Sequence, residues 1–134
     1  MEASVVVKVP FFDLDPMCVV WHGNYVKYFE IARCALLKKL RLSYEDMRDM
    51  GYVFPVVKMS LKFISPAEFN QDLEVRAAIV ESDCYLQIKY LVRDLKSGAK
   101  ICSGETKQMC VSAGTKQSFF ELPRDVKERL SCAS

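Results

Sequence analysis

The sequence predicts an α+β fold in which one long helix packs against an antiparallel sheet. Between Asn24 and Leu40, apolar side chains recur every three or four residues, which is the spacing of one helical face. From residue 52 onward the period changes to two, and four strand-like segments follow with short joins between them. Consecutive strands joined by short turns pair antiparallel, so helix and sheet form an α+β domain. A length of 134 residues suits a single domain over residues 1–134.

The first elements are a strand and the long helix. Residues 4–12 are mostly β-branched or aromatic, which predicts a strand that ends near Pro10 or lies at an edge. Residues 13–20 have no clear period, and we expect a loop. Gly23 and Asn24 suit the entry to the helix that follows, because Asn is a favourable N-cap. The apolar face of this helix consists of Tyr25, Phe29, Ala32, Leu36 and Leu40.

A short helix and four strands complete the predicted order. The residues from Ser43 to Asp46 form a capping pattern for a helix that stops at Gly51. A C-terminal helix begins near Pro123, which takes a favourable early position. The strands are expected at residues 52–64, 73–81, 85–93 and 99–111, with a hairpin turn at 94–98.

One helix can cover only one face of a five-stranded sheet. The strands at 73–81 and 85–93 nevertheless carry apolar residues on both faces. Because large exposed apolar surfaces usually mark contact sites, we expect the far face or an edge of the sheet to meet another subunit.

Composition excludes several classes of function. The 19 Lys and Arg residues against 17 Asp and Glu residues give a net charge of +2, without the strong basic excess of proteins that bind nucleic acid. The single histidine rules out a multi-histidine metal site within one chain. The six cysteines contain no Cys-x-x-Cys pair, so neither a zinc ribbon nor a thioredoxin-like motif is present. We expect reduced cysteines, no metal and no cofactor.

We also expect a cytoplasmic protein. The first residues carry Glu2 where a signal peptide would carry positive charge, and Lys8 and Pro10 interrupt the apolar stretch. The sequence has no run of 18 uncharged apolar residues, so no transmembrane segment is expected.

Residues 11–25, FFDLDPMCVVWHGNY, hold the side chains best suited to chemistry. The first amides of the long helix lack internal partners and are able to stabilise an oxyanion. A carboxylate on the preceding loop, Asp13 or Asp15, could act there as general base or nucleophile. The ring of His22, just before the N-terminus of this helix, could orient a carbonyl group or a water molecule. This arrangement predicts acyl transfer or ester hydrolysis.

Each of these residues also has a simpler interpretation. The pair Asp15-Pro16 is a common helix start, although the residues after it are poor helix formers. Asp13 is explained as a solvated turn residue and His22 as a structural histidine. Cys18 is a further candidate nucleophile with His22, but its loop spacing has no specificity. Lys58, Ser60 and Lys62 are explained as a solvated strand face.

The same stretch carries a recognisable signature. It runs Asp15-Pro16-x-x-Val19-Val20-x-His22-x-Asn24-Tyr25 and continues as Tyr28-Phe29-Glu30-x-Ala32-Arg33. This string resembles the signature of the hotdog-fold acyl-CoA thioesterases, in particular the 4-hydroxybenzoyl-CoA thioesterase family and the thioesterases of the bacterial Tol-Pal cluster. The resemblance covers about residues 4–130, with the later strands in the same order.

The resemblance implies a hotdog fold, with a five-stranded antiparallel sheet wrapped around one long central helix. It also implies a homodimer or homotetramer in which sheets join edge to edge and active sites lie between subunits. Asp15 matches the catalytic carboxylate, which attacks the thioester carbonyl or activates water. The backbone of His22 and Gly23 matches the oxyanion site, and the His22 ring is expected to assist. Asn24 and Tyr25 are expected to contact the substrate.

Three departures affect the expected substrate contacts. Phe11 stands where Tol-Pal-type members often have Tyr, and Met17-Cys18 replaces a pair of small residues, which narrows the acyl pocket. The turn at 82–84 lacks the basic cluster that holds CoA phosphates in the hydroxybenzoyl enzyme, so we expect these phosphates near Lys58 or Lys62. The leading prediction is an acyl-CoA thioesterase. An acyl-carrier-protein thioesterase and a non-catalytic acyl-binding protein are the alternatives.

Overall fold

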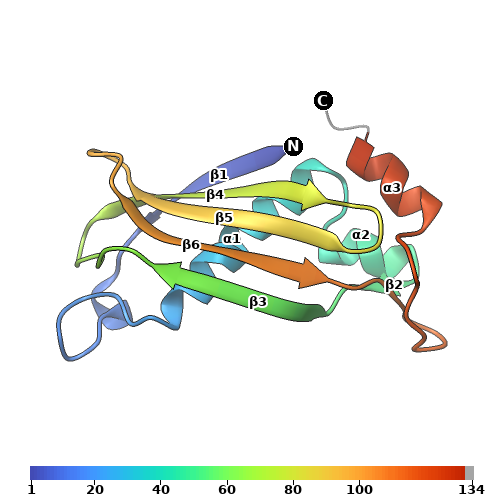
Figure 1. Ribbon diagram of the computed structural model, residues 1–134, viewed down its shortest axis with the longest axis horizontal. Helices are drawn as coiled ribbons and strands as arrows, with labels where there is room; N and C mark the ends of the chain where they lie inside the picture. Colours follow the sequence, from blue (N-terminus) through green and yellow to red (C-terminus); the bar gives the residue numbers. More distant parts are fainter. Residues whose placement is uncertain (132–134) are drawn as a thin grey trace.

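The computed structural model of the protein describes residues 1–131, and its centre is a five-stranded antiparallel sheet with one helix along it (Figure 1). The helix, α1 (Asn24–Lys39), packs mainly on β1 and β4. The strand order is β1-β4-β5-β6-β3, and all neighbouring pairs are antiparallel. The strands are β1 (Glu2–Lys8), β3 (Val56–Phe63), β4 (Asp72–Glu81), β5 (Leu86–Asp94) and β6 (Lys100–Gln108). This arrangement confirms the predicted α+β class and the hotdog architecture.

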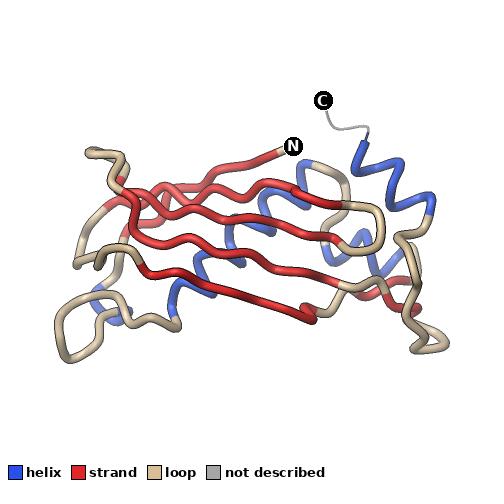
Figure 2. Tube along the Cα trace, viewed as in Figure 1, coloured by secondary structure: helices blue, strands red, loops and turns tan. Residues whose placement is uncertain are grey.

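Smaller elements lie at the two ends of this sheet (Figure 2). A single 3-10 turn, η1 (Phe11–Asp13), follows β1. At the other end, β2 (Tyr52–Val53) pairs with β7 (Val111–Ser112) beside the short helix α2 (Tyr44–Asp49). The chain closes with α3 (Arg124–Ser131). Among residues 1–131, the structure contains no helix long and apolar enough to cross a bilayer.

Three predicted strands differ from those observed, and prolines explain two of the differences. The strand expected at 52–64 is divided at Phe54-Pro55, where Pro55 cannot donate to a ladder. The strand expected at 4–12 begins at Glu2 and ends before Pro10, and η1 follows it. The strand expected at 99–111 ends at Gln108, whose side chain donates to the Phe54 carbonyl (2.8 Å). The residues after it turn away to form β7.

The long helix buries the face that its periodicity predicted. Tyr25, Phe29 and Ala32 are each at most 4% exposed, and Leu36 and Leu40 continue the same face. The expected N-cap is wrong by one residue, because Gly23 takes that position without a side-chain hydrogen bond. The Asn24 amide instead donates to the backbone carbonyl of Asp13 (2.9 Å), which connects the helix to the preceding segment.

The outer face of the sheet is more polar than expected. On β4 and β5, most of the large apolar side chains point toward α1. Their outward neighbours include Ala78 and Leu91 but also Arg76, Lys89 and Arg93. Large exposed apolar side chains gather instead near η1 and the start of α1, where Phe11, Phe12, Met17 and Trp21 are between 49% and 82% exposed.

One glycine determines how closely the helix approaches the sheet. The Phe29 ring stacks on Tyr90 with 4.4 Å between centroids, and the neighbouring strand contributes Gly104 at this point. A Cβ atom on Gly104 would lie 2.5 Å from the Ser60 carbonyl oxygen and 2.7 Å from Phe29 Cε2. These are clashes with the backbone and with a buried ring, so residue 104 has no room for a side chain.

We therefore expect Gly104→Ala to lower the free energy of unfolding by roughly 1–3 kcal/mol, as overpacked core sites do. Urea unfolding followed by circular dichroism measures this change. Gly114→Ala is the matched control, because only Ser112 Oγ, 4.0 Å away, lies near the added Cβ atom. Equal stability of the two variants would contradict the proposed packing constraint.

Candidate active site

The segment between η1 and α1 folds into a small loop, residues 14–20, which we call the Asp15 loop. Leu14 and Val20 form an antiparallel bridge at its base, and the Asp15 amide donates to the Val19 carbonyl (2.9 Å). Within the loop, the Asp15 carboxylate accepts from the Met17 amide (2.9 Å), and Cys18 has a positive φ of 64°. Asp15-Pro16 therefore begins a turn, and the alternative in which it begins a helix is wrong.

A cavity of about 300 Å³ lies between this loop, the start of α1 and the end of β3. Asp15, His22 and Tyr25 line it together, as the site prediction requires. The Phe63 ring lines it from the end of β3, with its centroid 6.1 Å from that of His22 and 5.9 Å from that of Tyr25. The remaining lining residues are Met17, Val19, Val20, Ile64, Ser65 and Pro66.

The N-terminus of α1 reaches this cavity through His22 and Tyr25, whereas Gly23, between them, is not among the lining residues. Within residues 1–131, the structure gives the amides of His22 and Gly23 no hydrogen-bond acceptor. Gly23 is the N-cap, and a Cβ atom there would lie 2.2 Å from the Trp21 ring, which covers the glycine backbone. Unpaired amides at a helix start attract negative charge, so these two suit a developing oxyanion.

Tyr25 and Asn24, both expected to contact the substrate, have different surroundings. Tyr25 lines the cavity, and burial is the main cause that raises its pKa to about 12. Its hydroxyl therefore keeps its proton at neutral pH and is suited to donate a hydrogen bond. Asn24 is not among the residues that line the cavity, and its side chain donates to the Asp13 carbonyl.

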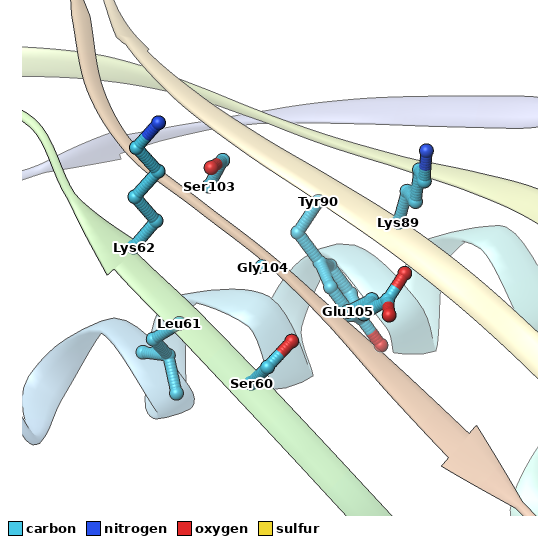
Figure 3. A pocket seen from close by; sticks show the side chains of 8 residues that line it. All are labelled: Ser60, Leu61, Lys62, Lys89, Tyr90, Ser103, Gly104 and Glu105. Atoms are coloured by element: carbon cyan, nitrogen blue, oxygen red, sulfur yellow. The ribbon is translucent and has the colours of Figure 1, made fainter.

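Lys58 and Lys62 lie away from this cavity. Lys62 lines a shallow groove of about 470 Å³ on the outer face of the sheet, with Ser60, Ser103 and Lys89 (Figure 3). It is adjacent in the chain to Phe63, which belongs to the cavity. Lys58 lines neither space.

Asp13 is a functional candidate whose environment the sequence did not reveal. It is only 3% exposed, so its prediction as a solvated turn residue is wrong. Its carboxylate accepts from Lys27 Nζ (2.8 Å) and from the Tyr28 hydroxyl (2.6 Å). These partners lie 14 and 15 residues away in the chain, and no short motif connects them. The contributions of Ile64, Ser65 and Pro66 to the cavity also had no sequence signal.

The cysteines lie outside the cavity. Cys18 is exposed and is not among the lining residues, so the geometry gives no support to Cys18 as a nucleophile with His22. Burial raises the pKa of Cys102 to about 11 and that of Cys110 to about 12, which keeps both as neutral thiols. All five cysteines in the described part of the chain are free. Nor do residues 1–131 contain a cluster of three His, Cys, Asp or Glu side chains suited to hold a metal ion.

Comparison with known proteins assigns the family. The family model of the thioesterase-like superfamily matches residues 9–130. The chain belongs to the thioesterase-like superfamily. Its match to the acyl-CoA thioester hydrolase YbgC of Escherichia coli O6:H1 is 32% identical over 73 residues. That match covers 54% of this chain and 54% of YbgC, so the chain matches about half the length of this relative.

Two solved structures match the fold of this protein over nearly the whole chain. The protein TT1821 of Thermus thermophilus is 31% identical, with a TM-score of 0.86, and the match covers 98% of this chain and 99% of that protein. A DHNA-CoA thioesterase of Staphylococcus aureus is 26% identical at the same TM-score of 0.86, with 98% and 89% covered. The hotdog fold expected from the Asp15-to-Arg33 signature is thus confirmed.

Proposed function

We propose that this protein hydrolyses the thioester bond of an acyl-CoA, with Asp15 as nucleophile or general base. The observation that carries this proposal is the single cavity lined by both Asp15 and His22, next to the free amides of His22 and Gly23. A carboxylate and an oxyanion site on one cavity are the two components that acyl transfer to water needs. Names of superfamily relatives, such as acyl-CoA thioester hydrolase, support the same reaction.

The reaction follows from these groups. Either the Asp15 carboxylate attacks the thioester carbonyl carbon, or it removes a proton from a water molecule that attacks. The carbonyl oxygen becomes negative and accepts hydrogen bonds from the His22 and Gly23 amides. Collapse breaks the carbon–sulfur bond and releases the CoA thiolate, which takes up a proton. In the nucleophilic route, water then hydrolyses the acyl-aspartyl anhydride and restores the carboxylate. The His22 ring and the Tyr25 hydroxyl orient the acyl carbonyl.

We expect Asp15→Asn to lower kcat for acyl-CoA hydrolysis by at least ~10²-fold, because the base or nucleophile is lost. Release of free thiol from a panel of short aliphatic to aromatic acyl-CoAs measures this change. Cys18→Ser is the control, and its kcat should match that of the unmodified protein. Acyl-CoA binding without hydrolysis by the unmodified protein would instead identify an acyl-binding protein.

We further propose that the CoA phosphates bind along β3 at Lys62, with Lys58 nearby. Lys62→Glu should then raise KM for acyl-CoA several-fold while kcat stays unchanged, because charge reversal repels the phosphates. Lys96→Glu, in the exposed β5–β6 turn, is the matched control. Faster hydrolysis of the same acyl group on an acyl carrier protein would favour the carrier-protein alternative.

We also propose a homodimer or homotetramer in the cytoplasm. β3 lies at the edge of the sheet with only β6 beside it, so its other side is free to pair with the same strand of a second copy. Light scattering during size-exclusion chromatography should give two or four times the chain mass of 15.3 kDa. A fully active monomer would contradict an active site that needs two copies.

A further inference from the structure

Asp13 carries a buried charge whose two oxygens are both engaged. Burying a carboxylate is costly unless it is paired and hydrogen-bonded. At 3% exposure, Asp13 meets both conditions through Lys27 Nζ at 2.8 Å and the Tyr28 hydroxyl at 2.6 Å. Both partners lie on the first turns of α1. The carboxylate therefore connects the chain before the Asp15 loop to the helix that follows it.

The backbone of Asp13 makes the same connection. Its carbonyl oxygen accepts from the Trp21 amide (3.0 Å) and from the Asn24 side-chain amide (2.9 Å). Its own amide donates to the Pro10 carbonyl (3.1 Å). Asp13 thus holds both ends of the Asp15 loop, because Trp21 follows directly after the loop.

At the base of the Asp15 loop, Val20 belongs to the hydrophobic core and Leu14 packs against it, but residues 15–19 have few contacts that could fix their position. The Val20 amide donates to the Ala67 carbonyl (2.9 Å), and Val19 forms a single bridge to Glu68. The tip is open to solvent, with Met17 77% exposed. The placement of Asp15 relative to α1 therefore depends largely on the contacts at the base of the loop.

We propose that Asp13, held by Lys27 and Tyr28, is a positioning residue that keeps Asp15 and the N-terminus of α1 on the same cavity. This inference rests on the proposed role of Asp15. Asp13 does not line the cavity, so it acts through the loop and does not touch the substrate. Burial raises the pKa of Tyr28, and the hydrogen bond to Asp13 raises it further, so the hydroxyl stays protonated and donates at working pH.

Tyr28→Phe tests the inference with a minimal change, since it removes one hydroxyl and keeps the ring. We expect kcat to fall by about 10- to 100-fold, the range that a small misplacement of a catalytic group produces. KM should stay within twofold. Asp13→Asn should act in the same direction and more strongly.

Tyr52→Phe is the matched control. The Tyr52 hydroxyl also donates to a carboxylate, that of Asp125 (3.0 Å), but it joins β2 to α3 at the opposite end of the sheet (Figure 1). If the role of Tyr28 is only structural, the two variants should have the same kcat, even where their free energies of unfolding differ. A real positioning role lowers kcat in Tyr28→Phe alone.

Fluorescence supplies a readout that does not depend on activity. Trp21 is the only tryptophan of the chain, it is half exposed, and its amide bonds to Asp13. We expect Tyr28→Phe and Asp13→Asn to change its emission and its quenching by acrylamide, and Tyr52→Phe to leave both unchanged.

Three results would overturn the inference. In the first, Tyr28→Phe and Tyr52→Phe have the same kcat and the same Trp21 quenching. The Tyr28–Asp13 hydrogen bond would then not hold the Asp15 loop to α1. In the second, Trp21 quenching changes but kcat does not. Asp13 would then hold the Asp15 loop to α1 without positioning Asp15 for the reaction. An unmodified protein that hydrolyses no thioester would overturn the proposed function and with it the catalytic purpose of Asp13. In that case Trp21 quenching would still report separately on whether the connection exists.

Discussion

The close packing of α1 on the sheet is the constraint on which the rest of the structure depends. Phe29 lies flat on Tyr90 only because the neighbouring strand carries Gly104 there. This contact fixes the depth of α1, and the buried face from Tyr25 to Leu40 fixes its rotation. The direction of the first helical turn, and therefore of its free amides, follows from both. Because the proposed oxyanion site consists of backbone amides, the positions of its hydrogen-bond donors depend on this packing.

The proposed catalytic carboxylate is supported by the core only at the base of its loop, through Leu14 and Val20. Asp15 lies on a loop whose tip is exposed, so its position must be defined where the loop joins the helix. Polar contacts perform this function: a buried carboxylate bonds to two side chains of α1, and one backbone carbonyl accepts two further hydrogen bonds. Buried polar groups that are fully paired define a geometry more narrowly than apolar contacts, because a shifted partner leaves a desolvated charge. The site therefore combines an apolar constraint on the helix with a polar constraint on the loop.

Periodicity was enough to predict the elements but not their interruptions. The long helix, the antiparallel sheet and the capped short helix all follow from local patterns, and the structure has them. The division at Phe54-Pro55 had a local signal in the proline, whereas the β2–β7 pair depends on a contact between distant segments, which the pattern of one segment does not contain. The same limit applies to the site. The Asp15, His22 and Gly23 positions follow from one continuous motif, whereas the burial of Asp13 depends on where α1 places Lys27 and Tyr28. The lining residues after β3 come from residues 64–66, a separate segment of the chain, and only folding brings them to the motif.

The exposure of the cavity lining supports the proposal that a complete site needs a second copy of the chain. Its lining includes Met17, Phe63 and Ile64, which are 77%, 54% and 46% exposed, so the cavity is open to solvent. Electrostatic stabilisation of an oxyanion is weaker in water than in a closed site. Phe63 ends β3, and β3 is also one of the two edge strands of the sheet, the other being β1. A second copy that pairs with this edge would cover the exposed apolar lining at the same time as it satisfies the free backbone groups of β3. Assembly and the exclusion of water from Asp15 would then depend on the same strand.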